Sequence, residues 1–303
     1  MISNIKILDG GMGRELARMG APFRQPEWSA LALMQAPEYV RAAHDAFIAA
    51  GSQVITTNSY AVVPFHVGEE VFAEQGAALI ALSGKLAREA ADAAPAKVRV
   101  AGSLPPVLGS YRPDLFEPVA AKKLLQVLVD NLTGNVDVWL AETQSSVAEV
   151  EAVRDVLGDD PRPLWLSFTL QDNLDPQGNA LLRSGESVEL AVSAALRISA
   201  GAVLFNCSRP EVMATAVKTA RDALTAQGSA LDIGVYANAF EPSDNTRGAN
   251  EGLSKMRQDT DPAGYLDFAK DWVAQGATMV GGCCGIGPEH IAALKQAFVK
   301  EHS

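Results

Sequence analysis

The chain has 303 residues, of which 48% are hydrophobic and 20% are charged, and its formal net charge is -11. This composition is typical of a globular protein with enough apolar material for a large core. The negative charge disfavours phosphate backbones and anionic lipid surfaces, so we expect neither a nucleic acid nor a membrane as partner. A small cationic or zwitterionic substrate fits better.

The N-terminal residues lack a basic segment followed by an apolar stretch, and no apolar run approaches the roughly 18 residues that span a bilayer. We therefore expect a cytoplasmic protein. The cysteines number three, Cys207, Cys283 and Cys284, and the adjacent pair makes a poor disulfide. Reduced thiols, either buried or bound to a metal, are favoured.

Short apolar runs rich in β-branched residues alternate along the chain with longer stretches of helical period. The short runs predict eight strands, at 5–8, 53–57, 97–103, 136–142, 164–170, 202–207, 232–238 and 277–282. The longer stretches predict eight helices, at 37–50, 70–93, 117–133, 145–157, 186–199, 210–226, 262–275 and 288–300. Eight such βα units indicate a (β/α)8 TIM barrel, with an open doubly wound sheet as the alternative.

No segment rich in Pro, Gly or Ser divides the chain, so we expect one domain over 1–303. The longest irregular stretches that we identify are 20–30, 104–116 and 241–261. The second and third each follow a predicted strand, and we expect all three to lie over the mouth of the barrel.

Active-site residues of such a barrel come from the C-terminal ends of the strands and the loops after them. The polar residues and glycines at these positions are Asp9, Gly10, Gly11, Asn58, Tyr60, Ser103, Glu142, Thr143, Asn206, Cys207, Asn238, Gly281, Gly282, Cys283 and Cys284.

The three cysteines follow strands six and eight, which one neighbour separates in a closed barrel. Their thiols can therefore converge at the mouth. Three protein ligands and one exchangeable position make a catalytic zinc site, whereas structural sites usually have four protein ligands. From the cysteines alone, three small buried thiols are an equally good interpretation.

Six segments carry a resemblance to a known family. They are ILDGGMGREL at 7–16, VITTNSY at 54–60, VAGSLPP at 100–106, LAETQS at 140–145, FNCSRP at 205–210 and MVGGCCGIGPEHI at 279–291. Together they resemble, in the same order, the homocysteine S-methyltransferase family of zinc barrels. The match extends from residue 7 to about 297, and the pairing of NC on strand six with GGCC on strand eight is highly specific.

The resemblance implies that zinc is bound by the three cysteines and that the sulfur of homocysteine takes the open position. It also implies that Asp9 and Glu142 hold the substrate ammonium group, for which two carboxylates are well suited. Backbone N–H groups near Gly10, Gly11 and Ser103 are the candidates for binding the substrate carboxylate. Asp9 as a turn cap and Glu142 as an ion pair at the rim are the alternatives.

The other polar candidates each have more than one interpretation. Asn58 and Tyr60 are candidate substrate contacts. Asn206 either positions Cys207, or occupies the zinc without substrate, or makes a hydrogen bond behind the ligands. A face of Phe23, Trp28 and Tyr60 suits a cationic donor, although such aromatics more often pack in the core.

The implied reaction starts from a thiol of pKa about 8.5, which zinc deprotonates so that the sulfur attacks a methyl group on a positively charged centre. By elimination we favour a sulfonium donor, S-methylmethionine or S-adenosylmethionine. Ala237 and Ala239 depart from the proline and serine usual in the family, which leaves the donor, and possibly the acceptor thiol, open.

Two other classes of function remain. A non-catalytic zinc-binding barrel would hold metal without methylating a thiol. An aldolase-like enzyme would need a Schiff-base lysine at a strand end, but Lys6 and Lys97 lie at strand beginnings.

Overall fold

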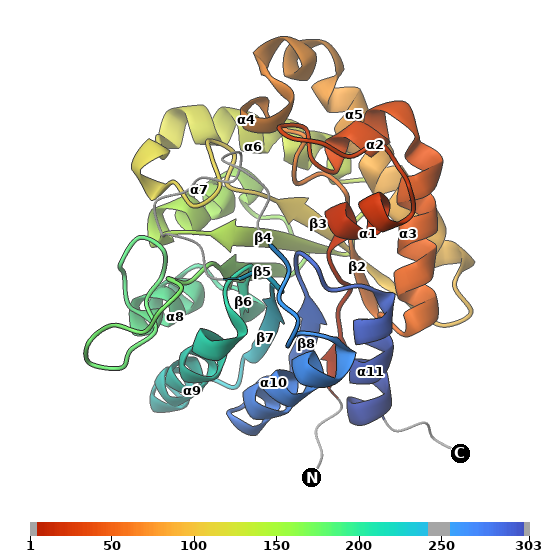
Figure 1. The fold of residues 1–303 in the computed structure, drawn as a ribbon. Helices are drawn as coiled ribbons and strands as arrows, with labels where there is room; N and C mark the ends of the chain where they lie inside the picture. Colours follow the sequence, from red (N-terminus) through yellow and green to blue (C-terminus); the bar gives the residue numbers. More distant parts are fainter. Residues whose placement is uncertain (1–4, 242–254, 300–303) are drawn as a thin grey trace.

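The computed structural model describes residues 5–241 and 255–299, and in them a ring of helices surrounds a parallel sheet of eight strands (Figure 1). The strands are β1 (Lys6–Ile7), β2 (Val54–Thr56), β3 (Arg99–Leu104), β4 (Val138–Gln144), β5 (Leu164–Phe168), β6 (Ala202–Asn206), β7 (Asp232–Ala237) and β8 (Met279–Gly282). Their order in the sheet is β1-β8-β7-β6-β5-β4-β3-β2, and all pairs are parallel. The predicted (β/α)8 TIM barrel is confirmed.

The predicted helices are also present, each within two residues of its expected limits. They are α3 (Pro37–Ala50), α5 (Glu69–Ala93), α6 (Pro118–Leu132), α7 (Val147–Leu157), α8 (Val188–Arg197), α9 (Pro210–Ala226), α10 (Pro262–Ala274) and α11 (Pro288–Phe298). Proline begins five of them, since its fixed φ and missing N–H suit a first turn. Short helices that we did not predict are α1 (Met12–Arg18), α2 (Ala30–Gln35), α4 (Pro64–Val67) and the 3-10 turn η1 (Pro113–Leu115).

Gln53 joins the first and last strands of the sheet order. Its backbone N–H donates to the carbonyl of Ile7 at 2.8 Å, and its side-chain oxygen accepts from the Ile7 N–H at 2.9 Å. The side chain of Asp9 continues this seam one step further, because it accepts from the N–H of Thr56 at 2.7 Å. Side chains therefore bridge β1 and β2 where these strands are short.

Two layers of apolar side chains stabilise the barrel. The inner layer fills the space between the strands and contains Leu140, Trp165, Leu204 and Met279, all buried. The outer, larger layer lies between the strands and the helices. No helix within 5–241 and 255–299 is long and apolar enough to cross a bilayer.

The loops after the strands differ in part from the expected set. The stretches 20–30 and 104–116 are largely irregular, with η1 inside the second, whereas most of 241–261 falls in 242–254, outside the described residues. We did not predict the long irregular stretch 169–187. It joins β5 to α8 and contains the isolated bridges Leu170↔Leu182 and Leu181↔Ser187. Its pair of leucines resembles the start of a helix, but the surrounding Gly, Asn and Pro favour turns.

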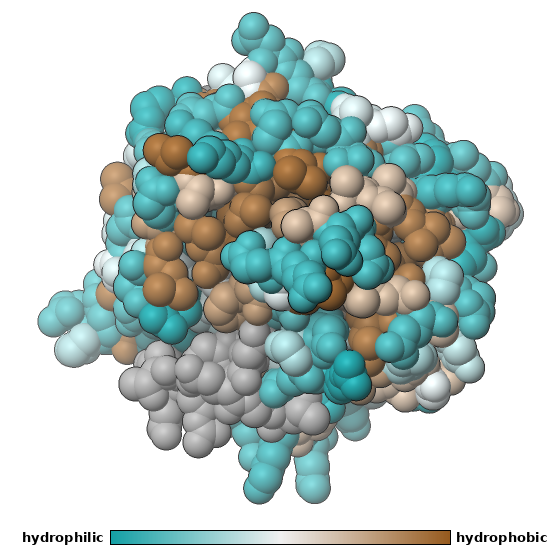
Figure 2. All heavy atoms as spheres, turned by 90° about the horizontal axis from the view of Figure 1, so that it is seen from above, coloured by the Kyte–Doolittle hydropathy of each residue, from teal (hydrophilic) through white to brown (hydrophobic). Residues whose placement is uncertain are grey.

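The rim formed by these loops is partly apolar. Seen from above, the surface has hydrophobic atoms across its middle, interrupted by a group of hydrophilic atoms and bordered by others (Figure 2). The large hydrophobic side chains that are most exposed in the described ranges all follow the C-terminal ends of strands, in loops or early helical turns: Leu115, Val119, Leu174, Leu190 and Met256.

Candidate active site

The three cysteines come together at the C-terminal ends of β6 and β8, as predicted from the strand order. Their sulfur atoms all lie within 4.8 Å of one another, and those of Cys207 and Cys284 are 3.9 Å apart. Strand β7 fixes the separation, since its backbone accepts from the N–H of Cys207 at 3.1 Å and from that of Cys283 at 2.8 Å. Segments far apart in the sequence thus form one sulfur pocket.

The donor set of this pocket fits a soft metal ion. Thiolates bind zinc at about 2.3 Å, which places the sulfur atoms of a tetrahedral site about 3.8 Å apart. The Cys207–Cys284 distance of 3.9 Å is near this value, and the other two pairs lie within 4.8 Å. Hydrogen bonds from Cys207 and Cys283, aided by the charge of Arg14, lower the pKa of Cys284, whereas hydrogen bonds to the other thiols raise the pKa of Cys283.

Glycines allow the β1 loop to approach the cysteine loop closely. A Cβ on Gly11 would lie 2.4 Å from the carbonyl oxygen of Cys283, and one on Gly10 would lie 2.3 Å from that of Ile286. The N–H of Gly11 donates to Ile286 at 2.9 Å, so that amide is already used and does not face a substrate carboxylate. These glycines are needed for close packing.

Asp9 and Glu142 form an acidic pocket next to the sulfur pocket. Asp9 accepts from the backbone and hydroxyl of Thr56, and Glu142 accepts from Ser103 at 2.5 Å and from Tyr236 at 3.2 Å. Both carboxyl groups are buried, at 9% and 8% exposure. Among the described residues neither is paired with a basic side chain. All their partners are neutral donors.

Burial without a cation changes the acidity of both groups. It raises the pKa of Asp9 to about 8, against the opposing hydrogen bond from Thr56 and with a further rise from the charge of Glu142. It raises the pKa of Glu142 to about 7, and the charge of Cys207 adds to that shift. Hydrogen bonds connect these acids with the cysteines. The hydroxyl of Tyr236 donates to Glu142 while its carbonyl accepts from the N–H of Cys207, and the carbonyl of Asp9 accepts from the N–H of Gly282, next to Cys283. Such a pair of acids is suited to bind a cation.

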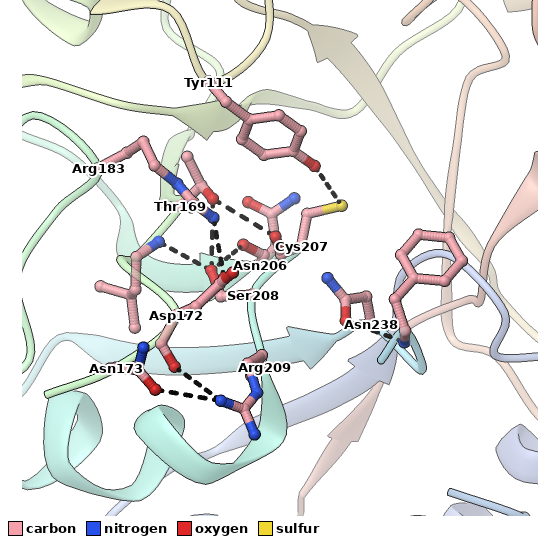
Figure 3. A network of polar contacts seen from close by, with 12 residues as sticks. Tyr111, Thr169, Asp172, Asn173, Arg183, Asn206, Cys207, Ser208, Arg209 and Asn238 are labelled. Carbon is pink, nitrogen blue, oxygen red and sulfur yellow. Dashed lines mark hydrogen bonds and ion pairs between the residues drawn. The ribbon is translucent and has the colours of Figure 1, made fainter. Parts of the chain in front are cut away.

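Two tyrosines line the sulfur pocket. The hydroxyl of Tyr111 donates to the sulfur of Cys207 at 3.0 Å (Figure 3), and that of Tyr60 lies 2.6 Å from the hydroxyl of Ser110. Burial raises the pKa of both phenols, and the charge of Cys207 raises it further. Both phenols are therefore neutral at ordinary pH. Tyr111 donates to Cys207, whereas either hydroxyl of the Tyr60–Ser110 pair can be the donor.

The amide of Asn206 is directed at neighbouring strands. Its oxygen accepts from the N–H of Thr143 at 2.9 Å and from Ser167 at 2.7 Å, and its nitrogen donates to the Thr143 hydroxyl at 2.8 Å. These contacts stabilise Thr143 at φ 58° and the end of β6, where Cys207 has φ 48°. Of the roles considered for Asn206, this geometry favours support behind the ligands.

The remaining candidates are spread around the mouth. Asn58 donates to the carbonyl of Ser29 at 3.1 Å, and its own oxygen is buried without a hydrogen-bond partner. Phe23 packs edge-on against Trp28 at 5.8 Å, whereas the ring of Tyr60 lies 6.3 Å from that of His66. The oxygen of Asn238 accepts from the N–H of Phe240 (Figure 3). The three aromatics are thus divided between two places.

Three residues that hydrogen-bond to the site were not predicted from the sequence: Thr56, Tyr111 and Tyr236. Strand alternation carried a signal for Tyr236, because it lies on β7 among inward-facing residues. Tyr111 lies in a loop, where no periodicity predicts the direction of a side chain. As expected from the sequence, Lys6 is not placed to form a Schiff base, because it lies near Asp232 at the start of β7, away from the mouth.

The structure is thus a parallel barrel with three convergent thiols that could hold a metal ion, and with two buried acids at the ends of its strands. The family model for homocysteine S-methyltransferase matches residues 6–298. The chain belongs to the homocysteine S-methyltransferase family.

Individual relatives agree with this assignment. The chain is 31% identical to homocysteine S-methyltransferase of Escherichia coli, over 96% of this chain and 94% of the relative. It is 28% identical to selenocysteine methyltransferase of Astragalus bisulcatus, over 95% and 90%. Its fold is similar to the crystal structure of the metallated form of the Escherichia coli homocysteine methyltransferase MmuM, with a TM-score of 0.77, 28% identity and coverage of 97% and 96%.

Proposed function

We propose that this protein transfers a methyl group from a sulfonium donor, S-methylmethionine or S-adenosylmethionine, to the thiol of homocysteine, giving methionine. The single observation that carries the proposal is the junction of the sulfur pocket and the acidic pocket. Homocysteine has a thiol at one end and an ammonium group at the other, so it matches both. Membership of the family supports the same reaction.

We assign the metal to zinc, with Cys207, Cys283 and Cys284 as ligands. When bound, zinc would lower the pKa of a coordinating thiol so that it reacts as a thiolate at neutral pH. The relative of known structure was solved in a metallated form, which supports a metal at this position.

Asp9 and Glu142 would hold the substrate ammonium group through charge-assisted hydrogen bonds. Thr56 orients the first carboxylate, and Ser103 with Tyr236 orients the second. Arrival of the ammonium charge favours the ionised form of both acids, which burial alone disfavours. The acids thus select an amino-acid thiol over a simple alkyl thiol.

The donor would enter beside Tyr60, whose position near the thiols suits the approach of a cation to an aromatic ring. Gly10 and Gly11 would shape the substrate pocket by letting the β1 loop lie against the cysteine loop. We assign Asn58 to the wall on the α2 side, through its contact with Ser29. The whole site would belong to one barrel domain.

The test is methionine formation by the purified protein loaded with zinc. Homocysteine is offered with S-methylmethionine and, separately, with S-adenosylmethionine, and the product is identified by mass spectrometry. Selenocysteine and cysteine serve as alternative acceptors, since one relative is named for selenocysteine. We expect methylation of homocysteine with at least one donor. Zinc binding without methylation of any acceptor would support the non-catalytic barrel instead.

A further inference from the structure

Tyr111 adopts an unusual backbone conformation next to the sulfur pocket. It lies in the loop between β3 and α6 with φ 62°, a left-handed region that costs a bulky residue of the order of 1 to 3 kcal/mol. Such a conformation persists only where the surroundings fix it. The contacts of its side chain fix this backbone conformation.

The side chain of Tyr111 is held at both ends. Its hydroxyl donates to the sulfur of Cys207 at 3.0 Å, and the guanidinium of Arg183 lies 5.0 Å from its ring centroid (Figure 3). Arg183 in turn lies 3.4 Å from the carboxylate of Asp172, and both of these side chains are largely buried. The phenol is thus fixed between the β5–α8 loop and a candidate metal ligand.

The contact distinguishes Cys207 from the other two thiols. Within 5–241 and 255–299, neither Cys283 nor Cys284 receives a hydrogen bond from a hydroxyl group. Cys207 also has φ 48°, so both partners of this hydrogen bond are in the left-handed region. Because this hydrogen bond joins two residues that both have an unfavourable backbone conformation, we expect the site to depend on it.

We infer that Tyr111 is a positioning residue for Cys207, which it orients toward the metal and whose sulfur it makes a weaker donor than the other two. This inference rests on the proposed metal site. A hydroxyl that donates to a thiolate draws electron density from the sulfur and restricts its direction. Interactions behind metal ligands of this kind set both the affinity for the metal and the electronic character of the ligand.

The experiment compares Tyr111→Phe with wild type and with Tyr60→Phe, the matched control. Tyr60 is, like Tyr111, a half-buried tyrosine beside the pocket, but its hydroxyl is bonded to Ser110 and not to a thiol. Each protein is loaded with Co²⁺, and the sulfur-to-cobalt charge-transfer absorption is recorded. Zinc affinity is measured by competition with a chelator, in the absence of substrate.

For Tyr111→Phe we expect the charge-transfer band to move to longer wavelength, because the sulfur regains electron density. We expect zinc affinity to fall by about 10-fold or more, because Cys207 loses its fixed direction and this loss outweighs its stronger donation. Tyr60→Phe keeps the wild-type band. A band in Tyr111→Phe identical to that of wild type would overturn the inference. If Tyr111→Phe does not fold, Arg183→Met serves as the second variant, and it should produce a smaller shift in the same direction; no shift there would likewise contradict the role of Tyr111.

Failure of the proposed function would look different. Methyl transfer would then be absent, whereas the Co²⁺ bands, which are recorded without substrate, would keep their response to Tyr111→Phe. A wild type that bound no Co²⁺ with thiolate bands would instead overturn the metal site and this inference together.

Discussion

The two halves of the barrel mouth hold their reactive side chains in different ways. In the acidic half, on β1 and β4, Asp9 and Glu142 are fixed by neutral hydrogen-bond donors and have no basic partner among the described residues. In the sulfur half, on β6 and β8, the thiols are fixed by the backbone of β7 and by Tyr111. The acidic half thus has two carboxyl groups that burial keeps protonated and that a cationic ligand would ionise, whereas the sulfur half has three thiols that could hold a metal ion.

Removing one thiol should have the largest effect. We expect Cys283→Ala to lose bound zinc and more than about 100-fold of the methyl-transfer rate, beyond the loss that changes behind a metal ligand produce. The measurements are metal content and kcat, with circular dichroism as a check of folding. A variant that retained one equivalent of zinc and full activity would remove the sulfur half from the reaction.

Neutralising the acidic half should weaken substrate binding without loss of metal. We expect Asp9→Asn and Glu142→Gln each to raise the KM for homocysteine by about 10- to 100-fold, since a hydrogen bond to a charged group contributes about 1.5 to 3 kcal/mol. The measurements are steady-state kinetics and zinc content.

Glu149→Gln is the matched control for these variants. Glu149 is a buried glutamate whose pKa burial also raises to about 7, but it caps α7 through Ser145 and Ser146. We expect its substitution to leave the KM for homocysteine nearly unchanged. Equal KM values in all three variants and wild type would show that Asp9 and Glu142 do not bind the substrate.

The smallest effect concerns stability and pH. The raised pKa values of about 8 for Asp9 and about 7 for Glu142 mean that the folded protein keeps protons that the unfolded chain releases near pH 4. Stability contributed by these groups is therefore lost as pH rises from about 4 to about 8. Asp9→Asn should be more stable than wild type at pH 8, by on the order of 1 to 3 kcal/mol, and gain less at pH 5. Urea unfolding at both pH values measures this; an equal difference at the two pH values would contradict it.

The barrel itself could be predicted from the sequence because its signals are local. Alternating apolar runs and helical periods mark each βα unit, and prolines such as Pro210 and Pro288 mark where helices begin. The convergence of the cysteines followed from strand order alone, since strands six and eight, separated by one strand, present their C-terminal ends to one mouth.

The positions that escaped prediction depend on contacts between distant segments. Tyr111 reaches Cys207 across 96 positions of the sequence from an irregular loop, and Tyr236 reaches Glu142 across 94. The direction of a loop side chain depends on tertiary packing, which no local pattern encodes. For the same reason the hydrogen bonds that occupy Asn206 and the N–H of Gly11 appear only in the folded structure.

The central claim is that one homocysteine molecule joins the two halves, with its sulfur on the metal of the sulfur half. X-ray absorption at the zinc edge counts the sulfur ligands directly. We predict three sulfur ligands in the zinc-loaded protein and four after addition of homocysteine. In Glu142→Gln the fourth sulfur should be absent at the same homocysteine concentration. A count that remained at three in wild type saturated with homocysteine would contradict it.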